Sequence, residues 1–233
     1  MSGTLEALAL AMAAFVASHL ALSSRPIRDR LVSLAGDTGF RAGYSLVAVA
    51  LLVWTVIAYA EAPSISVWSP PVWLKWAALP LMLLSCFLIV AGYATRNPTA
   101  VGADTGSIIE TGPSGVFRIT RHPVMWGVAL WGIAHLLASG DAGRMILFAG
   151  LTILALAGAA HSDARRAAAL GEPWAAYRRR TSFIPMEAIV TRRTPLRFGE
   201  IGWAPPLASL ALYALLLAAH PWLFGVSPVP GIG

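Results

Sequence analysis

The sequence predicts an all-α integral membrane protein in which about six transmembrane helices form one bundle. Hydrophobic residues make up 57% of its 233 residues and charged residues only 12%, whereas a soluble domain averages about 25% charged residues. The mean hydropathy is +0.68, and long apolar runs recur with polar stretches between them. These observations predict a single membrane domain over residues 1–233, embedded in lipid.

Six apolar runs are the candidate transmembrane helices. The first begins directly after Glu6 without preceding basic residues, so it resembles a first helix more than a cleaved signal peptide. The fourth and fifth runs are short, and the Gly-Asp-Ala-Gly sequence at 140–143 predicts a tight turn between them. The candidate spans are residues 7–23, 43–59, 72–94, 123–138, 145–160 and 207–224.

Nearly all of the 17 basic residues fall in the first, third and fifth connections between these spans. Alternate connections lie on the same side of a membrane, and cytoplasmic connections are rich in arginine and lysine. We therefore expect both termini to face away from the cytoplasm, most simply across a bacterial inner membrane. The net charge of +6 then reflects arginines retained on one side rather than a nucleic acid partner.

Two of these connections have a character of their own. Residues 26–35 alternate arginines with apolar residues, which predicts a short amphipathic helix on the inner membrane surface. A solvated linker is the alternative. Residues 95–121 are rich in Gly, Thr, Asn and Pro, which is typical of turns, and they lead into an Arg-His-Pro motif.

The motif Arg121-His122-Pro123 opens the fourth span. Proline suits the first position of a helix, so we expect His122 close to the N-cap, beside unpaired backbone N–H groups. Such a position attracts anions, and Arg118 and Arg121 add positive charge, which makes them candidate contacts for a substrate or lipid headgroup. Alternatively, these arginines only anchor the helix at the interface.

A second histidine, His135, follows His122 by 13 residues within the same span. A polar side chain inside a membrane is costly, which marks His135 as a functional candidate, although a hydrogen bond to a neighbouring helix would also explain it. Helical geometry places the two histidines on different faces, about 20 Å apart along the axis.

His19 and His161 lie near the predicted inner ends of the first and fifth spans, so they are expected near His122. Neutral imidazole is a good ligand for transition metals and haem iron; water or backbone could instead satisfy each ring. The covalent haem motif Cys-x-x-Cys-His is absent, as are the common zinc-protease and nucleotide-binding motifs. His220 precedes Pro221-Trp222 and is typical of an interfacial residue.

A cytoplasmic segment is predicted between the fifth and sixth spans. Pro173 can begin a helix there, and Trp174 and Tyr177 would share one of its faces. Arg178 begins a run of three arginines. These side chains could contact lipid headgroups or an acidic substrate, or they could only hold the segment on the inner side.

Three stretches resemble the NnrU family of membrane proteins. They are "RITRHPVMWGVALWGIAHLLASGD", "HSDARRAAALGEPWAAYRRRTSFIP" and the N-terminal "ASHLALSSRPIRDRLVSLAGDTGFRAGYSLVAV". The family includes 15-cis-zeta-carotene isomerases, so the resemblance implies b-type haem and cis–trans isomerisation of a long apolar, carotenoid-type substrate. It matches His19 and His135 to the two iron ligands and His122 to an alternative ligand. From the predicted topology alone, His19 with His122 or His161 is the closer pair.

Two alternatives remain open. Other bacterial members of the family are associated with nitrite and nitric oxide reduction, which suggests a non-enzymatic supporting factor in denitrification. The Arg-His-Pro motif also resembles isoprenylcysteine carboxyl methyltransferases and phospholipid methyltransferases, which implies S-adenosylmethionine lined by Arg121, His122, Tyr177 and Arg178. Those enzymes usually have adjacent glutamates where this chain has His161-Ser162-Asp163, a departure that places a possible iron ligand there instead.

Overall fold

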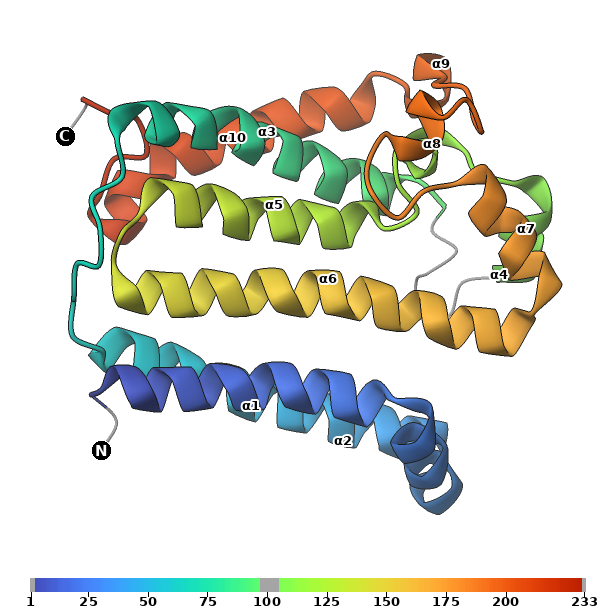
Figure 1. Ribbon diagram of the computed structural model, residues 1–233, viewed down its shortest axis with the longest axis horizontal. Helices are drawn as coiled ribbons and strands as arrows, with labels where there is room; N and C mark the ends of the chain where they lie inside the picture. The colour runs from blue at the N-terminus through green and yellow to red at the C-terminus, as the bar shows by residue number, and fades with distance from the viewer. Residues whose placement is uncertain (1–2, 97–104, 232–233) are drawn as a thin grey trace.

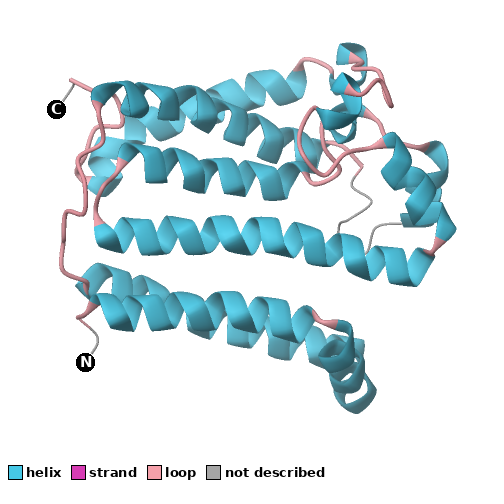
Figure 2. Cartoon of the chain, viewed as in Figure 1, coloured by secondary structure: helices cyan, strands magenta, loops and turns pink. Residues whose placement is uncertain are grey.

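The computed structural model describes residues 3–96 and 105–231, and within these ranges the chain is helical with no strand beyond one isolated bridge (Figure 2). The predicted all-α membrane bundle is confirmed. Five helices are long and apolar enough to cross a membrane: α1 (Leu5–Ser23), α2 (Arg25–Glu61), α3 (Val72–Ala94), α6 (Ala142–Leu170) and α10 (Ala204–Phe224). The fourth predicted span is α5 (Pro123–Ala138), a shorter apolar helix.

Shorter helices fill the connections between these elements. They are α4 (Thr105–Thr111), the 3-10 helix η1 (Gly115–Arg118), α7 (Glu172–Arg180), α8 (Glu187–Val190) and α9 (Phe198–Ile201). Part of the predicted turn-rich connection, residues 97–104, lies outside the described residues. The segment after α6 thus folds into three short helices, whereas the sequence predicted only the first of them.

Helix α2 contains both the predicted surface helix and the second predicted span. Its two parts meet at Gly36, where φ is 71° and ψ is 169°, a backbone conformation open to glycine but strained for other residues. Arg28 bonds Asp37 across this kink at 2.9 Å. Residues 26–35 are therefore helical, as predicted, and they turn away from the axis of the following span (Figure 1).

Helix α6 extends well beyond the predicted fifth span. The side chain of Asp141 caps its first turn by accepting the Arg144 N–H at 2.9 Å. At the other end, the helix continues to Leu170 and stops at Gly171, where φ is +58°. The apolar run ends earlier than the helix because the residues from His161 to Arg166 are mostly polar, and the helix continues through them toward the connection to α7.

Small residues let the central helices approach closely. Helix α5 packs between α3 and α6, while α1 packs against α2 and α6. The Ser85 hydroxyl donates to the carbonyl oxygen of Gly127 at 2.7 Å, which joins α3 to α5. A Cβ atom on Gly132 would overlap Thr152 and the backbone of Phe148, so the α5–α6 contact requires glycine there. A Cβ atom on Gly150 would displace only the flexible Met12 side chain of α1.

The two ends of the bundle differ. The α1–α2 junction and the helices α4, α7, α8 and α9 lie at one end, which carries nearly all the arginines (Figure 1). The start of α1, the end of α10 and the α5–α6 turn lie at the other. Large apolar side chains such as Trp203 and Trp222 are more than four-fifths exposed, at 83% and 86%. This apolar exterior identifies an integral membrane protein.

Candidate functional site

His122 is the N-cap residue of α5, as the sequence predicted, with Pro123 in the first turn. Its side chain is buried, and Nε2 lies 2.7 Å from Oδ1 of Asp163 on α6. A carboxylate accepts, so Nε2 carries the proton and donates. Burial lowers the pKa of His122 more than its contact with Asp163 raises it, so the ring is neutral at pH 7.

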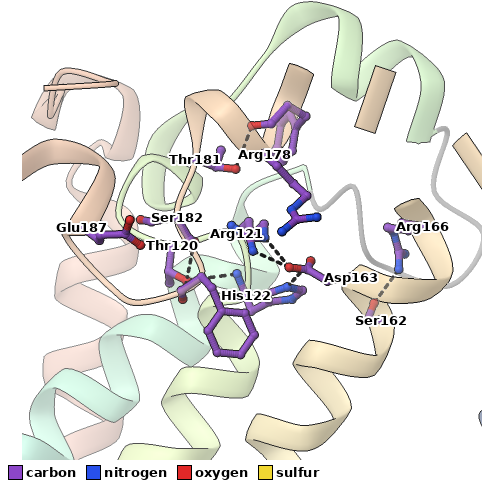
Figure 3. Close-up of polar contacts among 12 residues, drawn as sticks. Thr120, Arg121, His122, Ser162, Asp163, Arg166, Arg178, Thr181, Ser182 and Glu187 are labelled. Carbon is purple, nitrogen blue, oxygen red and sulfur yellow. Dashed lines mark hydrogen bonds and ion pairs between the residues drawn. The ribbon is translucent and has the colours of Figure 1, made fainter. Parts of the chain in front are cut away.

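Arg121 binds the same carboxylate. Its Nε donates to Oδ2 of Asp163 at 2.7 Å, and Nη2 donates to that oxygen as well (Figure 3). Arg121 and Asp163 are both buried. A buried charge is tolerated only when it is paired and hydrogen-bonded. Asp163 therefore joins the N-terminal end of α5 to α6, a role that the sequence interpretation did not assign to it.

The connection after α7 covers this cluster. The Thr120 hydroxyl and the Trp126 indole both donate to the carbonyl oxygen of Phe183, at 2.8 and 2.7 Å. The backbone N–H of Arg121 donates to the Ser182 carbonyl oxygen at 2.9 Å. Segments separated by about sixty residues are thus joined, and water is excluded from the Arg121–His122–Asp163 cluster.

Arg118 does not present its guanidinium to a substrate or headgroup. Its Nε and Nη2 donate to the two carboxylate oxygens of Glu200 at 2.7 and 2.9 Å, and Nη1 donates to Thr194 at 3.0 Å. This bidentate pair lowers the pKa of Glu200 to about 2. The predicted contact residue instead fastens the region around α9 to η1.

Trp174 and Tyr177 share one face of α7, as predicted, and their rings stack with centroids 5.4 Å apart. Both are buried, with 0% and 2% of their surface exposed. The Trp174 indole N–H and the Tyr177 hydroxyl have no hydrogen-bond partner within the described part of the chain. Burial raises the pKa of Tyr177 despite the nearby Arg121 and Arg180. Arg178, by contrast, is exposed.

His19 and His161 meet at the same end of α1. The His19 Nδ1 donates to the Phe15 carbonyl oxygen at 2.8 Å, and its ring contacts Phe15 and Tyr44. The His161 Nε2 donates to the Ser23 carbonyl oxygen at 2.8 Å. His161 thus links α6 to α1, one turn beyond His19, while Nε2 of His19 keeps a lone pair in the neutral ring.

His135 lies near the opposite end of the bundle, in the last turn of α5. Its Nδ1 donates to the Trp131 carbonyl oxygen at 2.8 Å, and its ring stacks on Phe148 with centroids 4.3 Å apart. The ring of His220 is 6.5 Å away, with 25° between the planes. The sequence indicated only an interfacial role for His220, because nothing in a linear pattern shows that the ends of α5 and α10 meet.

The structure does not bring His19 and His135 together. Phe148, which stacks on His135, and His161, which bonds one turn beyond His19, are 13 residues apart on α6. At about 1.5 Å per residue, these 13 residues span about 20 Å, and His19 lies one turn, about 5 Å, nearer to Phe148 than His161 does. The two imidazoles are therefore separated by about 14 Å along the bundle axis. Because a metal–imidazole bond is about 2 Å long, this arrangement does not fit one iron between both rings, although each ring alone has a suitable Nε2 lone pair.

The other metal-ligating side chains of the described residues are dispersed over the fold. Within residues 3–96 and 105–231, no three or more His, Cys, Asp or Glu side chains gather as a metal site would require. His122, the alternative ligand that the resemblance implies, commits its Nε2 to Asp163. The histidines that remain open at Nε2 are thus near the two ends of the bundle rather than in one cluster.

The fold and these polar clusters define a polytopic helical membrane protein with a buried Arg-His-Pro motif. The chain belongs to the NnrU protein family, whose profile matches residues 7–228. It is 35% identical over 137 residues to the chloroplastic 15-cis-zeta-carotene isomerase of Arabidopsis thaliana, covering 58% of this chain and 37% of that protein. With the Zea mays isomerase it shares 34% identity over 103 residues, covering 44% and 28%.

These alignments cover about a third of the length of the curated relatives. No solved structure matches the chain. Family membership therefore rests on the sequence profile, which extends over nearly the whole chain and agrees with the resemblance noted from the Arg-His-Pro and N-terminal stretches.

Proposed function

We propose that this protein isomerises a cis double bond in a long apolar, carotenoid-type substrate within the membrane. The observation that carries the proposal is the 35% identity over 137 residues with a 15-cis-zeta-carotene isomerase. A substrate of this kind dissolves in the hydrocarbon region, so it would reach the protein sideways from lipid. The apolar exterior of α2, α3 and α10 supports such an approach, since most of its large side chains are exposed.

Haem b is the cofactor in this proposal, with His135 as its protein ligand. The hydrogen bond from Nδ1 to Trp131 leaves the lone pair on Nε2, the atom that binds a metal in many proteins. When bound, haem would supply Lewis-acid or one-electron chemistry at the double bond, while the helices orient the substrate. Phe148 and Trp131 pack on the His135 ring and fix its orientation.

The proposal predicts different spectra for the two candidate ligand variants. After expression with added haem and purification in detergent, the wild-type protein should show a Soret band. His135→Ala should lose most of that band, whereas His19→Ala should retain it, because His19 is about 14 Å away along the axis. Far-ultraviolet circular dichroism checks that both variants remain helical.

Three outcomes of this experiment are distinguishable. Absence of a Soret band in the wild type overturns the haem proposal. Equal loss in His19→Ala and His135→Ala would favour two-histidine ligation, as the family resemblance implies, and would require the helices to move. Loss of the Soret band in His135→Ala alone supports ligation near the C-terminal end of α10, where His220 is the neighbouring imidazole.

The membrane placement belongs to the same proposal. We place the protein in a bacterial inner membrane with the arginine-rich end in the cytoplasm and both termini on the other side. The segregation of arginines to the end that carries α7, α8 and α9 supports this orientation. Arg178, which is exposed there, would then lie near anionic lipid headgroups.

A second candidate function is methyl transfer from S-adenosylmethionine. Its supporting observation is the pair of buried, unpartnered polar groups on Trp174 and Tyr177, since such groups normally find a partner. Titration calorimetry should then detect saturable binding of S-adenosylmethionine. Tyr177→Phe removes only the unpartnered hydroxyl and should weaken that binding without loss of fold. No binding to the wild type would contradict this function.

A further inference from the structure

A polar cavity of about 320 Å³ lies at the end of the bundle opposite the Arg121–His122–Asp163 cluster. It is formed by the connection between α2 and α3 and by the turn between α5 and α6, which lie side by side in Figure 1. The residues that line it include Lys75, Arg144, Asp141 and the four serines Ser64, Ser66, Ser69 and Ser139. Its volume is at the small end of the range of ligand pockets, about 300–1,000 Å³.

The walls of this cavity are fixed by backbone hydrogen bonds. The Val67 N–H donates to the Gly140 carbonyl oxygen, and the Ala142 N–H donates to the Ile65 carbonyl oxygen, both at 2.8 Å. Gly140 lies so close to the Trp68 backbone that a Cβ atom there would overlap it. The connection is thus clamped onto the turn, and the cavity between them is preformed rather than a gap in a loose loop.

Two cationic side chains line this cavity. Lys75, in the first turn of α3, and Arg144, in the first turn of α6, are both partly buried. Neither side chain makes a hydrogen bond or ion pair with any described residue. They are the two basic side chains of the sequence that lie outside the arginine-rich end. Asp141 is the one acidic side chain among the described residues of the lining, and despite burial its attraction to Arg144 lowers its pKa. One carboxylate cannot neutralise two partly buried cations, which points to an anion that completes the site.

Asp141 contributes one negative charge to the lining, and its two oxygens are already occupied. Oδ1 accepts the Arg144 backbone N–H at 2.9 Å, and Oδ2 accepts the Ser64 hydroxyl at 3.0 Å. The lining therefore keeps a net charge of +1. The hydroxyl of Ser139 accepts the Asp141 N–H at 3.4 Å, so its own proton remains available for donation.

We propose that this cavity binds a phosphate group, either as free phosphate or as the phosphate of a lipid headgroup. A tetrahedral oxyanion accepts several hydrogen bonds at once, and the lining offers an ammonium, a guanidinium and serine hydroxyls around one space. Arginine presents a planar fork to phosphate oxygens and lysine a point charge. The cavity lies where α3 and α6 begin, the level at which headgroup phosphates meet a membrane span.

The test compares two probes with the wild type, Lys75→Gln, Arg144→Gln and the control Arg30→Gln, all in a nonionic detergent after delipidation. Arg30 is exposed at the opposite end, so its substitution makes the same change in net charge away from the cavity. Inorganic phosphate is titrated by ³¹P NMR, and retention of phosphatidylglycerol is measured by native mass spectrometry. Arg144→Lys, which retains the charge, serves as the rescue variant.

We expect the wild type and Arg30→Gln to bind alike, and each cavity variant to bind about tenfold more weakly, the loss typical of one hydrogen bond to a charged group. Binding of inorganic phosphate identifies a free-anion site, whereas retention of phosphatidylglycerol without phosphate binding identifies a headgroup site. Equal binding by all variants, or binding of neither probe to the wild type, overturns the proposal. Because neither side chain makes a hydrogen bond or ion pair with the described residues, both glutamine variants should fold normally.

Discussion

Replacing Asp163 with alanine is expected to lower the free energy of unfolding by about 3–5 kcal/mol, the usual consequence of breaking a buried ion pair. The carboxylate receives bonds from both Arg121 and His122. Without it, the guanidinium would remain buried with no counter-charge, and the His122 Nε2–H would lose its acceptor. Both losses occur at the mouth of α5, where water does not reach.

Two further variants separate this effect from the loss of one negative charge. Asp163→Asn keeps the size and one acceptor oxygen, so it should be less damaging than Asp163→Ala but should still leave Arg121 uncompensated. Glu172→Ala removes an acid whose pair with Arg179 is exposed, at 75% and 65%, and should cost less than about 1 kcal/mol. Denaturant unfolding in detergent gives the ranking. If Asp163→Ala is no worse than Glu172→Ala, the cluster does not stabilise the fold.

The helices themselves could be predicted because their physical signal is local. A long apolar run must be helical in lipid, where each backbone group needs an internal partner. The predicted third and fourth spans therefore agree with α3 and α5. His122 was placed at the N-cap from Pro123 alone, since proline at the first helical position fixes where the helix begins. None of these conclusions requires knowledge of how helices face one another.

The polar clusters could not be predicted, because their contacts depend on how the helices face one another. Asp163 is 41 residues from His122 in sequence, and their contact requires the correct rotation of both α5 and α6. The same holds for Arg118 and Glu200, which are 82 residues apart. A charged residue in the last turns of a long helix is a signal that the sequence does contain, but it indicates burial only when the covering segment is known. Residues 182–183 supply that cover.

The pairing of His19 with His135 illustrates the limit of a family resemblance. Matching residues one by one says which side chains correspond, but it does not fix how far apart they lie in this chain. Here α6 separates the helices that carry them, and His135 instead approaches His220. The positions of His19 near the predicted inner end of the first span and of His135 deep in the fourth already predict a difference in depth, and the helix packing agrees with it.

Gly132→Leu is expected to destabilise the protein by about 1–3 kcal/mol or more, because overpacking in a close helix contact forces backbone movement. A Cβ atom at this position would overlap Thr152 and lie 2.9 Å from the Phe148 carbonyl oxygen. The α5–α6 contact must then open. Phe148 would move away from the ring of His135, which lies one turn beyond Gly132 on α5. The thermal midpoint in detergent and haem retention should therefore fall together.

The matched control for this substitution is Gly158→Leu on α6. A Cβ atom there meets nothing within 4 Å, so leucine can extend into lipid, and replacing glycine in a helix gains about 1 kcal/mol in helix propensity. The same change of residue type should thus be neutral or stabilising at 158 and harmful at 132. Equal effects at the two positions would show that glycine matters for the flexibility of its helix rather than for contact. Destabilisation by Gly132→Leu alone shows that glycine is required for the close α5–α6 contact, which also orients His135.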